Sequence, residues 1–370
     1  MIVPPATVGV LGGGQLGRYF VLAARTMGYT TVVLDPDRDA PAGKVADRHV
    51  VAAYDDEHAL AELADRCAVV TTEFENPPAS TMEWLAKHVE VHPSAEAVAI
   101  AQDRRAEKAF VAGLGIPIAP YAEIETARHV VEAGDFAYPA ILKTARLGYD
   151  GKGQVDVASG SELDAAWDRL DRQPCVLEQR LHLDAEVSVV LARSHAGDVA
   201  DYAVAANTHV AGILDCTIVP YPAPAAHALA TQIATALDYV GVLAVEMFVV
   251  DDRLLVNELA PRPHNSGHWT LDAARTSQFE QQVRAVCGAG LGDPALTTPA
   301  VAMVNLLGDL WAGGEPRWEA ALAHPQASLH LYGKSSARPG RKMGHLTVSG
   351  PTTDDAERVA RALRSGLVAR

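Results

Sequence analysis

Two glutamates set in consecutive apolar segments constrain this sequence most strongly. Glu246 interrupts the apolar run Val242–Val250, and Glu258 lies near the end of the next run, Arg253–Leu259. The aspartates at positions 251 and 252 predict a hairpin that pairs position 246 with 257 or 258, depending on loop length. Carboxylates that face each other on a sheet repel, and burying them costs more. A divalent cation removes this objection, and carboxylates are ligands that Mg²⁺ prefers.

The segment after the second glutamate is dense in hydrogen-bond donors. Two prolines stiffen it, and Arg262, His264 and Asn265 are placed to converge on an anion beside the metal. The alternative interpretation leaves one glutamate in water and pairs the other with a cation such as Arg262. We favour a functional site, because so many donors lie next to the expected metal.

The first hundred residues alternate between strand and helix patterns. Apolar segments at 6–11, 30–34 and 69–72 predict strands, and Gln15–Met27 predicts a helix, so we expect a parallel α/β sheet. Gly12, Gly14 and Gly17 form a G-x-G-x-x-G motif after the first strand, and Asp35 follows the second strand. This pattern is typical of a dinucleotide site. Another phosphate-bearing ligand or tight packing would also explain it.

A second glycine-rich segment follows a short strand at Ala140–Thr144, which carries Lys143. The loop Gly148–Gln154 offers backbone N–H groups to phosphates, and lysines supply charge. Its spacing differs from that of a Walker A loop. A flexible hairpin loop with a solvated lysine is the alternative interpretation.

Composition limits the possible functions. A 370-residue chain predicts two or three domains. Its net charge of −15 argues against a nucleic-acid or membrane-surface binder. No apolar run approaches the roughly 18 residues that cross a bilayer, and no signal peptide is evident. The four cysteines are far apart in sequence, which predicts reduced thiols in a cytoplasmic protein. The basic segment Arg338–His345 would suit a phosphate monoester or be a solvated loop.

Together these segments resemble the ATP-grasp superfamily and, more closely, the N5-carboxyaminoimidazole ribonucleotide synthetase family of purine biosynthesis. The resemblance runs from Val8 to about His345 and lies in the segments Gly12–Arg18, Gly148–Gln154, Asn257–Trp269 and Pro339–His345. It implies a mixed α/β and α+β chain in three parts. These are a Rossmann-like pre-ATP-grasp domain at 1–104, an ATP-grasp domain at 105–295 with a lid at about 116–184, and a small β-rich C-terminal domain at 296–370.

The resemblance also implies a reaction. ATP, bicarbonate and 5-aminoimidazole ribonucleotide would give the N5-carbamate, ADP and phosphate through carboxyphosphate, with Mg²⁺ as cofactor. The enzyme would be a cytoplasmic carbon–nitrogen ligase and a homodimer, with small-molecule substrates and neither nucleic acid nor membrane as partner.

Roles for individual residues follow from the same resemblance. Glu246 and Glu258 would hold Mg²⁺, while Arg262, His264 and Asn265 would cradle bicarbonate. The residues expected to act in catalysis also include Tyr149, Asp150 and Lys342. Those expected to bind ATP are Arg104, Lys143, Gly148, Gly151, Lys152, Gly153, Gln154, Glu178, Gln179, Arg180, Leu181, Glu186, His209, Asn257 and Glu258. Those expected to bind the ribonucleotide are Gln15, Leu16, Glu73, Asn76, Arg341 and Lys342.

Competing functions would differ from this one in their sequence features or in their products. A formate-dependent glycinamide ribonucleotide transformylase or a biotin carboxylase would share the ATP chemistry but not the string Arg262–Trp269. An NAD-dependent oxidoreductase would use Gly12–Gly17 and leave the paired glutamates unexplained. A silent nucleotide-binding regulator would bind ATP without releasing ADP.

Overall fold

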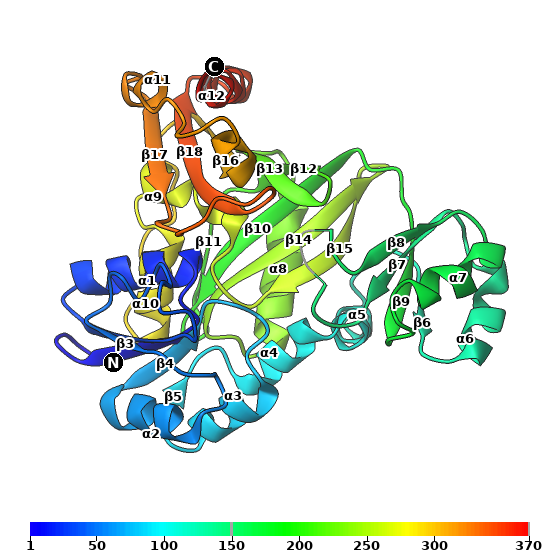
Figure 1. Ribbon diagram of the computed structural model, residues 1–370, viewed down its shortest axis with the longest axis horizontal. Helices are drawn as coiled ribbons and strands as arrows, with labels where there is room; N and C mark the ends of the chain where they lie inside the picture. The colour runs from blue at the N-terminus through cyan, green and yellow to red at the C-terminus, as the bar shows by residue number, and fades with distance from the viewer. Residues whose placement is uncertain (149–150, 369–370) are drawn as a thin grey trace.

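The structure, a computed structural model, describes residues 1–148 and 151–368. It contains three sheets that lie side by side (Figure 1). Tyr149 and Asp150, which were expected to act in catalysis, lie outside the described residues. Across the described part of the chain, no helix combines the length and apolar character needed to cross a membrane. All four cysteines are buried and free, as predicted.

The N-terminal sheet is parallel, with strand order β3-β2-β1-β4-β5. The predicted strands at 30–34 and 69–72 are confirmed, and their valines are buried because helices cover both faces of a parallel sheet. The elements are β1 Thr7–Leu11, α1 Gln15–Thr26, β2 Thr30–Leu34, β3 Arg48–Val50, α2 Glu57–Arg66, β4 Val69–Thr72, α3 Ala79–Ala86, β5 Glu90–Val91 and α4 Ala95–Gln102.

A small antiparallel sheet with strand order β6-β9-β7-β8 stands at one end of the molecule (Figure 1). It has its own apolar core, which includes Leu142 and Trp167. This sheet occupies the region expected to form a lid. Its elements, with the helix that leads into it, are α5 Arg104–Gly113, β6 Tyr121–Ile124, α6 Ala127–Glu132, β7 Ala140–Thr144, β8 Gln154–Val157, α7 Leu163–Asp168 and β9 Cys175–Gln179.

The largest sheet runs through the middle of the molecule in the order β15-β14-β10-β12-β13-β16-β18-β17, with β11 paired to β10. Its first strands are β10 Ala185–Arg193, β11 Val199–Asp201, β12 Ala205–Val210, β13 Ile213–Val219, β14 Gly241–Val250 and β15 Arg253–Ala260. Its last strands are β16 Ala300–Leu307, β17 Ala327–Leu331 and β18 Lys342–Gly350. Because β13 pairs with β16, the C-terminal strands extend the central sheet instead of forming a sheet of their own.

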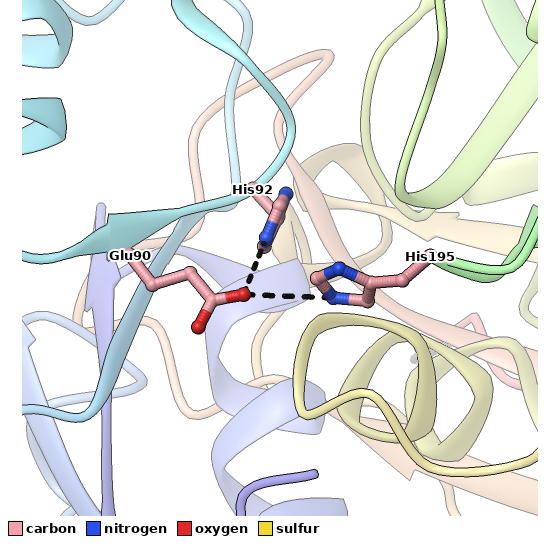
Figure 2. A group of neighbouring side chains, drawn as sticks. All are labelled: Glu90, His92 and His195. Carbon is pink, nitrogen blue, oxygen red and sulfur yellow. Dashed lines mark hydrogen bonds and ion pairs between the residues drawn. The ribbon is translucent and has the colours of Figure 1, made fainter.

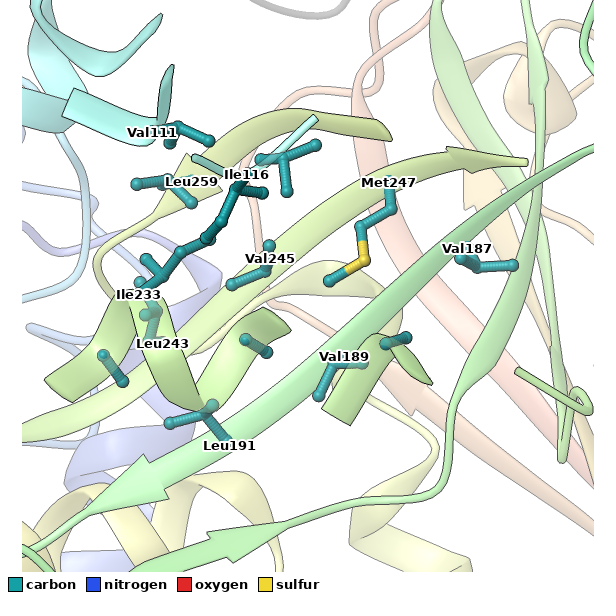
Figure 3. Close-up of a cluster of buried hydrophobic side chains, with 14 of the residues drawn as sticks. Val111, Ile116, Val187, Val189, Leu191, Ile233, Leu243, Val245, Met247 and Leu259 are labelled. Carbon is teal, nitrogen blue, oxygen red and sulfur yellow. The ribbon is translucent and has the colours of Figure 1, made fainter. Parts of the chain in front are cut away.

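Helices cover this sheet. Figure 3 shows Ile233 of α8 and Val111 of α5 packing against apolar side chains of β10, β14 and β15. At the other end, Arg361 and Arg364 of α12 both pair with Asp215 of β13. The helices are α8 Ala225–Ala236, α9 Thr270–Ala273, α10 Gln278–Val286, α11 Glu319–Leu322 and α12 Thr353–Gly366. Short 3₁₀ helices lie at Ala133–Asp135, Gly160–Glu162, Asn265–Gly267 and Gly308–Trp311.

The hairpin of β14 and β15 sets the register of the paired glutamates. Val250 pairs with Arg253, so Asp251 and Asp252 form a two-residue turn, with φ of 49° and 60°. Such a turn alone would place position 257 opposite 246. A bulge between positions 246 and 247 shifts the ladder by one residue, and Glu246 therefore pairs with Glu258.

The turn provides a test of this register argument. Both aspartates lie in the left-handed region, which glycine adopts without steric cost. We expect Asp252→Gly to raise the thermal unfolding midpoint by about 1 °C, corresponding to roughly 0.5–1 kcal/mol in a chain of this length. Differential scanning calorimetry would measure it, with Asp55→Gly, at an exposed turn position without a positive φ, as the matched control. A lower midpoint for Asp252→Gly would contradict this account.

Candidate functional site

The paired glutamates line a cavity of about 460 Å³ that the small sheet and the central sheet share. Glu258 Oε2 lies 3.2 Å from Arg104 Nη1, and Glu246 Oε1 lies 3.4 Å from His264 Nε2. Arg262, the cation named in the alternative interpretation, instead pairs with Glu75 at 2.6 Å. Burial and the nearby Glu258 carboxylate raise the pKa of Glu246 to about 7.

Asn257 directly precedes Glu258 in the chain and is the extra residue of the bulge. Its amide oxygen is buried and has no hydrogen-bond partner among the described residues. The side chains of Glu246, Asn257 and Glu258 thus place oxygen atoms along one bulged stretch of the sheet. Few positive charges and few hydrogen-bond donors of the described residues contact these oxygens. Oxygen ligands of this kind suit a hard divalent cation. The residues therefore fit the magnesium predicted from the sequence.

A cluster of buried positive charge lies on the lid side of the same cavity. Lys143 Nζ lies 3.0 Å from one oxygen of Glu178, and Lys108 Nζ lies 3.3 Å from the other. Burial lowers the pKa of Lys143, although Glu178 opposes that shift. Two lysines share a single carboxylate, with Arg104 nearby, so this wall can accept the charge of phosphates. Sequence reasoning missed Lys108 because a lysine inside an amphipathic helix gives no signal of burial.

The structure brings nearly all the predicted nucleotide residues to this cavity. Gly153 does not line it; a side chain there would meet Thr144, so this glycine serves the packing of the loop. His209 Nδ1 lies 2.9 Å from Glu186 Oε2, and this bond raises the pKa of His209 against the effect of burial. The predicted residues that line the cavity are Arg104, Lys143, Gly148, Gly151, Lys152, Gln154, Glu178, Gln179, Arg180, Leu181, Glu186, His209, Asn257 and Glu258.

A second cavity, of about 550 Å³, meets the first. Among the residues common to both are Arg262, His264, Asn265 and Lys342. We call these four the shared corner. Its Asn265 is 5% exposed, and within the described residues both amide atoms of that side chain lack a hydrogen-bond partner. A buried amide left in this state indicates a ligand, because leaving both atoms unpaired is costly.

A chain of hydrogen bonds beneath the shared corner fixes the tautomer of His264. Thr217 donates to the Asn207 carbonyl, the Asn207 amide donates to Ser188, and the Ser188 and Ser266 hydroxyls lie 2.8 Å apart. Ser266 approaches His264 Nδ1 with its hydroxyl at 2.9 Å and its backbone N–H at 3.3 Å.

A backbone N–H can only donate, so His264 Nδ1 must accept. Burial, with the charges of Arg262 and Lys342, lowers the pKa of His264 well below its usual range, so the ring is neutral and carries its hydrogen on Nε2. In this arrangement Thr217 donates to Asn207, Asn207 to Ser188, Ser188 to Ser266, and Ser266 to His264 Nδ1. His264 presents an N–H donor to the cavity.

The second cavity is lined by a basic wall. Lys334 Nζ donates to Gln15 Oε1 at 2.9 Å and to the Lys342 carbonyl at 2.6 Å. The predicted Gln15, Leu16, Arg341 and Lys342 all line this cavity, as do Lys334 and Arg338. Neither of the last two was named as an individual residue, although Arg338 lies in the basic segment noted in the sequence.

The glycine motif near the N-terminus differs from the dinucleotide interpretation. Asp35 accepts the Gly13 N–H at 2.6 Å, and Glu73 accepts the N–H groups of Gly14 and Gly17 at 2.7 and 2.8 Å. Carboxylates of the chain itself therefore occupy the amides that would hold a pyrophosphate. The interpretation of this motif as an NAD site is wrong.

The same contacts bear on two residues that were expected to bind the ribonucleotide. Glu73 is engaged with the glycine turn and lines neither of the two cavities described above. Asn76 lies instead in a small adjoining pocket with Gln102 and Glu107. Their predicted contact with the ribonucleotide stays a prediction.

Family models match three consecutive parts of the chain. They are a ribonucleotide synthetase preATP-grasp domain at 5–102, an ATP-grasp domain at 109–279 and a phosphoribosylaminoimidazole carboxylase C-terminal domain at 301–359.

Whole proteins match over nearly the full length. The N5-carboxyaminoimidazole ribonucleotide synthase of Brucella melitensis is 46% identical over 359 residues, covering 95% of this chain and 98% of that protein. The crystal structure of the Thermus thermophilus synthetase is 40% identical with a TM-score of 0.90, covering 98% and 99% of the two chains. The Aspergillus clavatus enzyme in complex with ADP and 5-aminoimidazole ribonucleotide is 31% identical, with a TM-score of 0.87 and 98% of each chain covered.

The fold, the two joined cavities and these likenesses agree with the resemblance noted in the sequence. The chain is an ATP-dependent ligase with the ATP-grasp fold, and it belongs to the N5-carboxyaminoimidazole ribonucleotide synthetase family.

Proposed function

We propose that this chain uses ATP to carboxylate 5-aminoimidazole ribonucleotide with bicarbonate, giving N5-carboxyaminoimidazole ribonucleotide, ADP and phosphate. The observation that supports this best is the shared corner. One cavity carries Lys143 and the paired glutamates, the other carries the basic wall, and both open onto Arg262, His264, Asn265 and Lys342. The proposed reaction transfers a phosphoryl group from a nucleotide to a small anion and then joins the activated anion to a second, phosphorylated substrate. Such a reaction needs two substrate cavities that open onto one anion-binding corner.

In this proposal the first cavity takes ATP, and Lys143 and Arg104 neutralise its phosphates. Glu246 and Glu258, with the Asn257 carbonyl beside them, would hold Mg²⁺, which supplies positive charge to the phosphoryl group during transfer. The backbone of residues 178–181 would meet the adenine, and Glu186 would bind the ribose. Positioning and charge neutralisation account for most of the catalysis of phosphoryl transfer.

The shared corner would receive bicarbonate. Arg262 is charged and buried, His264 donates from Nε2, and Asn265 has both amide atoms available among the described residues. An oxygen of bicarbonate would attack the γ-phosphorus and ADP would leave, forming carboxyphosphate. The amine of the ribonucleotide would then form a bond to the carboxyl carbon as the bond from that carbon to the phosphate oxygen breaks, and the leaving phosphate would accept the proton that the amine loses. A corner lined by donors holds both anions while keeping their charges apart from bulk water.

The second cavity would hold the ribonucleotide, with Arg341 and Lys342 on its phosphate. We also propose the domain boundaries 1–104, 105–295 and 296–370, which the family-model matches at 5–102, 109–279 and 301–359 support. A homodimer and a cytoplasmic location are proposed from the family resemblance.

The proposed reaction is tested by ADP release from the purified protein with each component omitted in turn. We expect ADP only when Mg²⁺, bicarbonate and 5-aminoimidazole ribonucleotide are all present. Glu258→Gln should lower the rate at least about a hundredfold, because it removes a carboxylate from the proposed metal pair. The exposed Glu57→Gln serves as the control and should keep full activity. Equal ADP release without the ribonucleotide would contradict the substrate assignment.

The basic wall can be tested separately from the ATP site. We expect Arg341→Ala to raise the KM for the ribonucleotide about 10–100-fold, because a charged hydrogen bond to phosphate contributes about 1.5–3 kcal/mol. The KM for ATP should stay within about twofold, since Arg341 does not line the first cavity. The exposed Arg317→Ala is the matched control. Steady-state kinetics that show both KM values rising together would oppose the assignment.

The hydrogen-bond chain under His264 makes a distinct prediction. Ser266→Ala removes the hydroxyl that donates to Nδ1 but keeps the backbone N–H, so His264 should keep its hydrogen on Nε2 while its ring is held less firmly and kcat falls about tenfold. Long-range ¹H–¹⁵N correlation spectra distinguish the two tautomers, and His264→Gln assigns the signal. The exposed Ser365→Ala should change neither quantity. A hydrogen moved to Nδ1, or an unchanged kcat, in Ser266→Ala would contradict this account of the hydrogen-bond chain.

A further inference from the structure

A cluster of two histidines and one glutamate lies away from both cavities, where the N-terminal sheet meets the central sheet. Glu90 belongs to β5, His92 follows it directly, and His195 lies in the turn after β10 (Figure 2). One ligand atom from each residue lies within 4.8 Å of the other two. None of the three lines the cavities assigned to ATP and the ribonucleotide.

The side chains converge on a single point. Figure 2 shows both imidazoles directed at the same oxygen of Glu90, with His92 Nε2 at 3.0 Å and His195 Nε2 at 3.7 Å from Oε1. The two rings are nearly perpendicular, at 83°. In a tetrahedral zinc site with bonds of about 2.0–2.1 Å, neighbouring ligand atoms stand about 3.3 Å apart. Small side-chain rotations therefore suffice to seat an ion.

The backbone already holds each histidine in place. The His92 N–H donates to the Val70 carbonyl at 3.0 Å, which fixes it to the N-terminal sheet. His195 lies in a turn closed by the bonds Ser194 N–H to Asp198 and Gly197 N–H to Ser194. Because the backbone around these side chains is already ordered, binding an ion requires little further loss of conformational freedom. Partial exposure of His195 and Glu90 leaves room for a water as fourth ligand.

The chemistry of the ligand atoms indicates which class of metal the cluster suits. Imidazoles with one carboxylate favour zinc and its neighbours over magnesium or calcium, which prefer oxygen ligands.

A second triad among the described residues lacks this geometry. Asp272, His330 and His345 also lie within 4.8 Å of one another. However, the rings of His330 and His345 stack at 4.4 Å with only 15° between their planes. In-plane lone pairs of stacked rings run side by side instead of converging on one ion.

We propose that Glu90, His92 and His195 form a binding site for Zn²⁺, completed by water, that ties the N-terminal sheet to the central sheet. Two of the ligands come from one sheet and the third from the other, so the bound ion joins segments about a hundred residues apart in sequence. An ion that binds only the folded, docked arrangement stabilises that arrangement.

Zinc binding to the full chain tests this site. Equilibrium dialysis with Zn²⁺ alone as the probe, in excess Mg²⁺ to occupy the glutamate pair, should show one equivalent in the unmodified protein. That equivalent should be lost in both Glu90→Gln and His195→Ala. Two controls should retain it: His58→Ala removes an exposed histidine outside the cluster, and His330→Ala removes the second triad.

Three further measurements guard against misfolding of a variant. Co²⁺ in place of Zn²⁺ should give visible absorption of a tetrahedral ion in the unmodified protein, absent from Glu90→Gln. Zinc should raise the thermal midpoint of the unmodified protein and leave that of His195→Ala unchanged. ADP release by His195→Ala should equal that of the unmodified protein. The loss of the zinc site can therefore be told apart from a failure of the proposed reaction. Unchanged zinc stoichiometry in both variants, or no zinc equivalent in the unmodified protein, would overturn the proposal.

Discussion

The facing carboxylates of Glu246 and Glu258 are the interaction on which the site depends. Two like charges paired across a buried ladder oppose folding unless the surroundings compensate for them. The compensation comes from Arg104 at the start of α5 and His264 after β15. This compensation is incomplete, because the pKa of Glu246 remains well above the usual value of a carboxyl group. A bulge creates the pairing, and a straight ladder would have placed Asn257 there instead. The central sheet therefore keeps a local electrostatic repulsion at the hairpin of β14 and β15.

The continuity of the central sheet explains why the two substrate cavities keep a fixed relation. Glu246 lies on β14 and Lys342 begins β18, and hydrogen-bonded strands join them without a break. The small sheet with Lys143 is a separate layer with its own core. Rigid elements hold reacting groups more precisely than loops do. The first cavity thus takes one wall from the small sheet and the other from the central sheet.

Sequence reasoning predicted most of the fold and most of the site, for reasons that differ by residue. The buried strands of the N-terminal sheet are short apolar runs between turn residues, so their bounds were found almost exactly. The pair of glutamates was found because charge in an apolar run is unusual. Lys108 was missed, since burial of a helical lysine depends on the tertiary partner Glu178. The role of Glu73 was not seen either, because its bonds to the glycine turn span 56 to 59 residues.

The glycine turn that Glu73 and Asp35 occupy has a consequence for selectivity among cellular nucleotides. Tethered carboxylates compete with any free pyrophosphate at a high effective concentration, because they cannot diffuse away. A dinucleotide would have to expel two internal anions, one of them bonded to two N–H groups, before it could bind. The chain thus keeps the backbone shape of a nucleotide-binding turn while its own side chains occupy the amides of that turn. In the function proposed above, an adenine nucleotide binds instead in the cavity between the small sheet and the central sheet.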